Sequence, residues 1–203
     1  MDKDRSKRYV LHRREVVKQL LDNRGDMLVV AGLGAAAWDI TAAGDVPLNF
    51  PLWGAMGGAV ALGLGLALAQ PSRRVLVITG DGEMLMGIGS LATVAIQKPE
   101  NLAMVVLDNE RYGETGMQCT HTAGCVDLAA MAAGNGISVC STIRDEKDFN
   151  TTLPQIRNSA GPCFFNIKVR AEDLPLILPP KDGAYLKDRF RDALLGSDAA
   201  AIR

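Results

Sequence analysis

A carboxylate and an amide side chain follow two apolar runs of the sequence, in an arrangement that suits a metal–diphosphate site. Gly80-Asp81-Gly82 comes directly after the run Val75–Thr79, and Asn109 follows the next such run. In open α/β sheets the helices that start at this edge bind phosphates, because their free N–H groups and positive dipole ends face the ligand. Asp81 and Asn109 would add two hard oxygen ligands for Mg²⁺. The sequence therefore predicts a Mg²⁺–diphosphate site.

The elements that must position these residues alternate between strands and helices. The expected strands are Met27–Ala31, Val75–Thr79, Leu102–Leu107, Ile137–Thr142 and Cys163–Val169. The expected helices are one capped by Ser6 and stopped at Gly25, then Gly34–Ala43, one within the uncharged stretch 46–72, Leu85–Gln97, Leu128–Gly134, Asp145–Asn158 and Tyr185–Leu195. Each strand is a continuous apolar run, which is typical of strands buried on both faces. We therefore predict an α/β fold, a doubly wound parallel sheet with helices on both faces.

Length and composition limit the possible classes of protein. The 203 residues suit one domain, 1–203, with a C-terminal extension from about residue 175, where Pro175, Pro179 and Pro180 mark an irregular exit. Lys plus Arg number 22 and Asp plus Glu number 23, so no nucleic-acid face is expected. The four cysteines lack zinc spacing, and reduced thiols in a cytoplasmic protein are expected.

The stretch 46–72 carries no charge and approaches the length of a membrane span. Glycines recur through it, and Pro47 and Pro51 precede its most apolar part. No Lys/Arg cluster flanks its N-terminal side. We therefore expect a helix buried against other backbone, and no membrane association.

Four blocks around the predicted site carry a resemblance to a known family. They are Trp53–Gly58, Gly80–Met86, Gly89–Thr93 and Leu107–Gly116. In this order they resemble the diphosphate-binding domain of thiamine-diphosphate enzymes, and above all that of the sulfopyruvate and phosphonopyruvate decarboxylases. The resemblance covers most of residues 10–195. It implies thiamine diphosphate and Mg²⁺ as cofactors.

The resemblance also assigns roles to individual residues. The metal ligands would be Asp81, Asn109 and the backbone carbonyl of Arg111. Further cofactor contacts would come from Gly34, Gly54, Met56, Gly80, Gly82, Glu83, Tyr112 and Gly113. Met56 would lie between the two cofactor rings and hold the cofactor bent, and His121 could relay a proton or bind an acidic group of the substrate. Simpler interpretations stay open: a helix cap for Asp81, a turn residue for Asn109, core filling for Met56 and a structural or surface role for His121.

The resemblance further implies a partner. In that family a glutamate that contacts N1′ of the cofactor's pyrimidine comes from a separate pyrimidine-binding domain, and 203 residues suffice for the diphosphate half alone. The chain would then be a β-type subunit that needs a pyrimidine-binding α subunit supplying this glutamate, in an α₂β₂ or larger hetero-oligomer. The reaction implied is decarboxylation of a small 2-oxoacid, a sulfonated or phosphonated pyruvate, to CO₂ and an aldehyde.

Other functions remain compatible with the residues. A carboligase or a 2-oxoacid oxidoreductase component could use the same cofactor, and a regulatory module could hold a Mg²⁺–diphosphate ligand without catalysis. A dinucleotide-binding module would want GxGxxG after the first strand. The turn 32–37 reads GLGAAA, and no acidic residue ends a second strand about 20 residues later.

Overall fold

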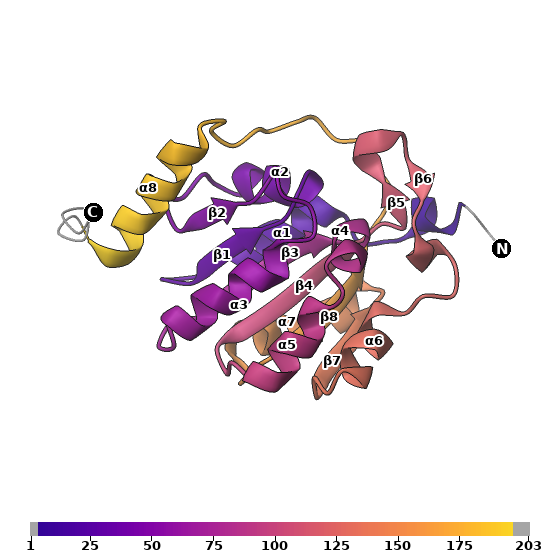
Figure 1. Ribbon diagram of the computed structural model, residues 1–203. Coiled ribbons are helices and arrows are strands. Elements are labelled where there is room, and N and C mark those ends of the chain that lie inside the picture. The colour runs from indigo at the N-terminus through magenta and orange to yellow at the C-terminus, as the bar shows by residue number, and fades with distance from the viewer. Residues whose placement is uncertain (1–3, 197–203) are drawn as a thin grey trace.

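The computed structural model of the protein describes residues 4–196. Its centre is a six-stranded sheet in the order β2-β1-β3-β4-β8-β7, in which every neighbouring pair is parallel (Figure 1). The strands are β1 (Leu28–Ala31), β2 (Asn49–Pro51), β3 (Val75–Gly80), β4 (Leu102–Asp108), β7 (Val139–Ile143) and β8 (Cys163–Lys168). The five predicted strands are confirmed, and β2 is a sixth that lies inside the uncharged stretch.

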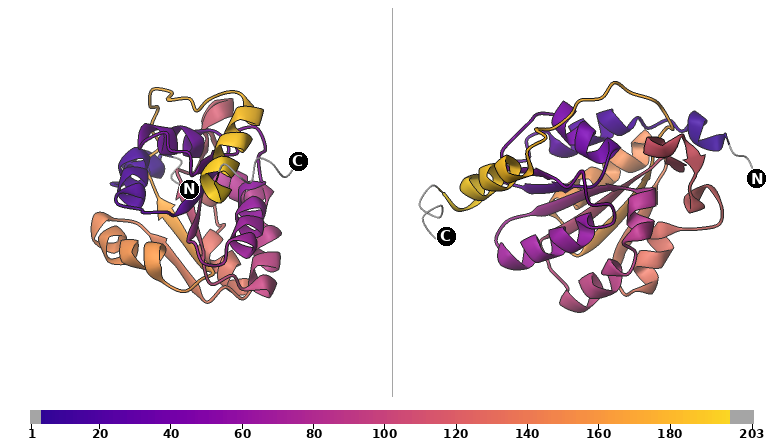
Figure 2. Two further views of the ribbon diagram at one scale, coloured as in Figure 1. Left: turned by 90° about the vertical axis from the view of Figure 1, so that its left-hand side faces the viewer. Right: turned by 45° about the horizontal axis from the view of Figure 1, so that its top comes forward.

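Helices cover both faces of this sheet, as predicted (Figure 2). One face packs against α1 (Arg13–Leu21), α2 (Ala35–Ala42) and α7 (Glu146–Asn158). The other packs against α3 (Ala59–Ala69), α4 (Asp81–Met86), α5 (Ser90–Gln97), α6 (Leu128–Gly134) and α8 (Gly183–Leu195). Two separate apolar clusters therefore sandwich the strands, which explains why each strand is a continuous apolar run.

The strand register brings the predicted site together at the carboxyl edge of the sheet. Gly80 at the end of β3 pairs with Leu107 of β4, and Asp108 pairs with Lys168 of β8. The chain after β4 forms a small excursion rather than a plain loop. It contains β5 (Arg111–Tyr112), the 3₁₀ turn η2 (Gly113–Thr115), β6 (Gln118–Cys119) and the 3₁₀ turn η3 (His121–Ala123). β5 and β6 pair antiparallel and hold this segment above the edge.

The uncharged stretch forms β2 and α3. A Cβ placed on Gly63 would lie 2.2 Å from Cγ2 of Val77, so the missing side chain lets α3 approach β3 closely. This is the packing predicted for a glycine-bearing buried helix. Within the part of the chain that the structure describes, no helix is long and apolar enough to span a bilayer.

Two predicted helices have different bounds. The first does not begin at Ser6: the 3₁₀ turn η1 (Arg5–Arg8) comes first, and Leu11 then bridges Val169 in parallel, so the chain there is extended and α1 starts at Arg13. The helix predicted over Leu85–Gln97 is two helices, α4 and α5. The chain turns at Gly87, which the carbonyl of Gly57 approaches too closely for any side chain.

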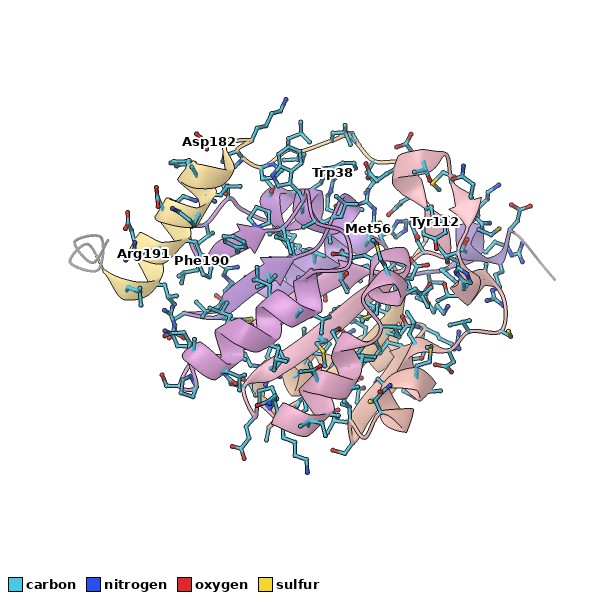
Figure 3. The ribbon with its side chains drawn as sticks, in the orientation of Figure 1. Trp38, Met56, Tyr112, Asp182, Phe190 and Arg191 are labelled. Atoms are coloured by element: carbon cyan, nitrogen blue, oxygen red, sulfur yellow. The ribbon has the colours of Figure 1, made fainter. Side chains whose placement is uncertain are left out.

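The segment after β8 crosses the molecule before its last helix. It runs irregularly from residue 169 to Asp182, whose side chain caps α8 by accepting hydrogen bonds from the amides of Ala184 and Tyr185. α8 then lies over β2, where the Phe190 and Phe50 rings meet edge to face at 5.3 Å. Figure 3 labels Phe190 on α8. The division into one domain plus a C-terminal extension remains a prediction.

Candidate cofactor and metal site

A pocket of about 150 Å³ opens at the carboxyl ends of β3 and β4. Nine of the predicted site residues line it: Met56, Gly80, Asp81, Gly82, Glu83, Asn109, Arg111, Tyr112 and Gly113. Three predicted residues are not among its lining. Gly34 caps α2 beside the lining residues Leu33 and Ala35, Gly54 lies in the segment before Met56, and His121 stands behind Tyr112.

Asp81 is a buried carboxylate in the lining of this pocket. It is 2% exposed and begins α4. Its Oδ2 accepts hydrogen bonds from the hydroxyls of Thr120 and Thr122, the latter at 3.0 Å. Burial, and then the neighbouring charge of Asp108, raise the pKa of Asp81 to about 7. The two threonines fix one carboxylate oxygen, so Oδ1 is the oxygen that would serve the predicted metal.

Asp108, directly before Asn109, has a role apart from the pocket. Its carboxylate accepts from Lys168 Nζ at 2.6 Å, from Asn166 Nδ2 at 3.0 Å and from the Thr122 hydroxyl at 2.8 Å. Asp108 does not line the pocket. The ion pair with Lys168 compensates the buried negative charge of Asp108.

Asn109 and Arg111 face the pocket from one turn. Asn109 Oδ1 accepts the backbone N–H of Arg111 at 2.9 Å, which is the turn interpretation of this residue. An amide oxygen has two acceptor sites, so one remains for a cation. The Arg111 guanidinium donates to the Glu110 carbonyl and to Cys119 Sγ.

Met56 and Tyr112, both labelled in Figure 3, contribute to the apolar lining of the pocket together with Leu33 and Leu107. Met56 is 37% exposed, so it does not fill the core, and the core interpretation is wrong. The Tyr112 ring packs on Gly82, where a Cβ would lie only 2.4 Å from a ring carbon. Its hydroxyl is 3.5 Å from His121 Nδ1, a long contact that brings the histidine near the pocket but not into it.

Glu83 uses its side chain to join two turns of the site. Its Oε2 accepts from the Thr79 hydroxyl at 2.8 Å and from the backbone N–H of Leu33 at 2.9 Å. Burial raises the pKa of Glu83, and these bonds oppose that shift. The carboxylate thus links the turn after β1 to the turn after β3.

Sequence reasoning missed several side chains at the site. Thr120 and Thr122 lie in a polar loop that gave no hint of which member faces Asp81. Lys168 did leave a signal, since a lysine in an apolar strand buried on both faces needs a buried partner. Arg13 was missed as well: it is 5% exposed, lines the pocket and pairs with Asp39 Oδ2 at 2.6 Å.

The chemistry of the donor set fits Mg²⁺ on a diphosphate. Among residues 4–196 no cluster of three His, Cys, Asp or Glu side chains could hold a metal ion, and the expected site needs none. One carboxylate, one amide and one backbone carbonyl are hard oxygen donors, and diphosphate oxygens and water can complete an octahedron. Asp81, Asn109 and Arg111 would hold the metal, and the first amides of α4 would face the diphosphate.

We expect Thr120→Val to weaken Mg²⁺-dependent binding of thiamine diphosphate about tenfold, because it removes one of the two hydroxyls that fix Asp81. Loss of such a hydrogen bond to a carboxylate costs about 1–2 kcal/mol of binding free energy. Thr120→Ser retains the hydroxyl and should bind like the wild type. Titration of the cofactor at fixed Mg²⁺ measures the difference. Equal affinity of Thr120→Val and wild type would show that Asp81 needs no such support.

Comparisons with known proteins agree with this geometry. Residues 35–167 match the family described as thiamine pyrophosphate enzyme, C-terminal TPP binding domain. The chain is 37% identical to the sulfopyruvate decarboxylase subunit beta of Methanothermobacter thermautotrophicus over 93% of this chain and 98% of that subunit. It is 37% identical to the phosphonopyruvate decarboxylase of Streptomyces hygroscopicus over 81% of this chain but only 41% of that enzyme.

A solved structure supports the fold. The benzoylformate decarboxylase from Polynucleobacter necessarius superposes with a TM-score of 0.65 at 18% identity, covering 82% of this chain and 34% of that one. At this identity the likeness concerns the fold alone. The predicted cofactor, thiamine diphosphate, is the one that gives the matched family its name. With the family match and the beta-subunit likeness together, the chain belongs to the thiamine pyrophosphate enzymes, as their C-terminal TPP binding domain.

Proposed function

We propose that this chain is the diphosphate-binding subunit of a two-subunit, thiamine-diphosphate-dependent 2-oxoacid decarboxylase. The observation that carries the proposal is the 37% identity to a sulfopyruvate decarboxylase subunit beta along 98% of that subunit, combined with a pocket that gathers the oxygen donors. The substrate class is a 2-oxoacid with a second acidic group, as in sulfopyruvate or phosphonopyruvate. The products are CO₂ and an aldehyde.

The residues of this chain bind and shape the cofactor. Bound thiamine diphosphate supplies the carbanion chemistry that cleaves the bond between the carboxylate and the 2-oxo carbon. Asp81 Oδ1, Asn109 Oδ1 and the Arg111 carbonyl would hold Mg²⁺. The amides of Gly82 and Glu83 would face the diphosphate. In these roles the residues of this chain would bind and orient the cofactor.

The rest of the catalytic site would come from a partner. We propose a pyrimidine-binding α subunit that supplies the glutamate for N1′ of the cofactor's pyrimidine, in an α₂β₂ or larger assembly. The name of the similar Methanothermobacter protein, a subunit beta, supports a two-chain enzyme. The similarity to less than half of the phosphonopyruvate decarboxylase supports the same division of labour, with both halves on one chain there.

Met56→Ala tests the proposed bent cofactor. Met56 is 37% exposed, so its truncation removes little core and should leave the melting temperature nearly unchanged. If its side chain holds the two cofactor rings in the reactive geometry, kcat should fall roughly 10- to 100-fold while the affinity for thiamine diphosphate falls much less. Met56→Leu is the matched control. A fall in affinity alone would assign Met56 to binding only.

The experiment that tests the function is a calorimetric titration of thiamine diphosphate with Mg²⁺ into the chain alone and into the chain co-purified with its candidate α subunit. We expect tight, Mg²⁺-dependent binding only with the partner. CO₂ release from sulfopyruvate, phosphonopyruvate and pyruvate would then define the substrate, and analysis of the product would separate an aldehyde from a carboligation product. Absence of cofactor binding in every combination would refute the proposal.

A further inference from the structure

The residue between the two loop donors of the proposed metal site has an unusual backbone. Glu110 stands between Asn109 and Arg111 and has φ 61°, in the left-handed region that residues other than glycine rarely adopt. Its N–H donates to Asp108 Oδ1, and its carbonyl accepts from the backbone of Thr120. The direction in which the Asn109 side chain and the Arg111 carbonyl point depends on this turn, so whatever holds Glu110 also sets the donor geometry.

The Glu110 side chain is held by groups that come from distant parts of the chain. It is 1% exposed. Its carboxylate accepts from Arg5 Nε at 2.9 Å and Arg5 Nη2 at 2.7 Å, from the Tyr9 hydroxyl at 2.7 Å and from Lys168 Nζ at 3.0 Å. A guanidinium that donates through two nitrogens fixes both the position and the plane of a carboxylate.

Arg5 also contacts the other side of the same site. Its Nη2 donates to the carbonyl of Thr122 at 2.8 Å, and Thr122 is one of the two residues whose hydroxyls hold Asp81. One guanidinium therefore joins the turn that carries Asn109 and Arg111 to the segment that holds the metal carboxylate. Figure 1 shows the N-terminal turn η1, in indigo, beside β5 and β6.

The N-terminal segment is itself anchored, so it can transmit a fixed position. The Ser6 carbonyl accepts the amide of Ala171, and the Tyr9 carbonyl accepts Arg170 Nε at 2.8 Å. Ser6 is fully buried. These bonds tie the segment to the chain that leaves β8.

Charge balance explains why Arg5 is needed. Asp108 and Glu110 are two buried carboxylates that share Lys168, whose Nζ lies 2.6 Å from Asp108 and 3.0 Å from Glu110. Arg5 supplies the second positive charge. Without it both carboxylates would depend on one ammonium, and the left-handed turn at Glu110 would lose its most directional restraint.

We propose that Arg5, supported by Tyr9, is a positioning residue for the metal site, acting through Glu110 and Thr122 on Asn109, Arg111 and Asp81. The inference rests on the proposed function, because it assumes that these donors bind Mg²⁺ with thiamine diphosphate. It makes the N-terminal segment, more than 100 residues away in sequence, a part of the cofactor site.

The test is a Mg²⁺ titration at saturating thiamine diphosphate, with the chain in complex with its partner. Arg5→Gln should raise the Mg²⁺ concentration at which half of the complex has bound Mg²⁺ about tenfold, as expected for loss of a charge-assisted hydrogen-bond pair. The value for Arg5→Lys should lie between those of the wild type and Arg5→Gln. Lys7→Gln is the matched control, since Lys7 lies on the same turn and its side chain forms an exposed ion pair with Asp4, away from the Glu110 carboxylate. It should bind Mg²⁺ like the wild type.

A double-substitution cycle separates positioning from a general effect on folding. In the Glu110→Gln background, Arg5→Gln should change the Mg²⁺ half-saturation clearly less than it does in the wild-type background, because only the contact of Arg5 with the Thr122 carbonyl is left to lose. Additive effects, or a lower melting temperature of Arg5→Gln with unchanged Mg²⁺ half-saturation, would overturn the inference. If the wild-type complex binds no thiamine diphosphate, the proposed function fails and this inference fails with it; normal wild-type binding with unaffected Arg5→Gln refutes only the role of Arg5.

Discussion

Asp81→Asn should abolish Mg²⁺-dependent binding of thiamine diphosphate, with a loss of affinity of at least 100-fold. The carboxylate is the charged oxygen donor that we assign to the metal, and Thr120 and Thr122 already occupy its Oδ2. An asparagine can accept from these hydroxyls only by turning its amide oxygen toward them. That places the NH₂ group where the metal needs an oxygen, so the substitution removes the charge and the ligand together.

The same variant should not unfold the protein. Asparagine is nearly isosteric with aspartate and needs no compensation for a buried charge, so the cofactor-free chain should be at least as stable as the wild type. Binding is measured by calorimetry in the complex with the partner, and stability by thermal melting without cofactor. Tight, Mg²⁺-dependent binding by Asp81→Asn would remove Asp81 from the metal site, whereas loss of the fold would make the binding result uninformative about ligation and shift the test to Asn109→Ala.

The sheet could be predicted from the sequence because its physical signal is local. Continuous apolar runs such as Leu102–Leu107 can be satisfied only by burial on both faces, and the alternation with helices then requires parallel pairing. The predicted start of the first helix was wrong because a tertiary contact there outweighs the local capping pattern. Ser6 looks like a helix cap, but the backbone bridge between Leu11 and Val169 keeps the following chain extended.

The pocket was predictable for residues tied to strand ends and not for those on the loop between β4 and α6. Asp81 and Asn109 follow strands whose register places them side by side. Thr120, by contrast, reaches Asp81 only because the β5–β6 hairpin folds the loop back over the edge. Arg5 reaches Glu110 through packing of the N-terminal turn, and no spacing in the sequence encodes a contact between residues so far apart.

The cofactor-free chain should lose stability as the pH rises from about 4 to about 7. Burial raises the pKa of Asp81 to about 7, while an aspartate in the unfolded chain titrates near 4. Between these values the folded state binds more protons than the unfolded state, so the free energy of unfolding falls with rising pH. A shift of about three units corresponds to at most about 4 kcal/mol.

Asp81→Asn is the control that isolates this group from the other buried carboxyls. Burial also raises the pKa of Glu83, so this group too makes the free energy of unfolding fall as the pH rises. Glu110 acts in the opposite direction, because hydrogen bonds from Arg5, Tyr9 and Lys168 outweigh its burial and lower its pKa. These contributions are common to both proteins. The difference in unfolding free energy between Asp81→Asn and wild type, measured by urea denaturation, should therefore be small at pH 4 and grow in favour of the variant toward pH 8. A difference that stays constant over this range would mean that the pKa of Asp81 is the same in the folded and unfolded chains, and that the threonine hydroxyls compensate its burial without a metal.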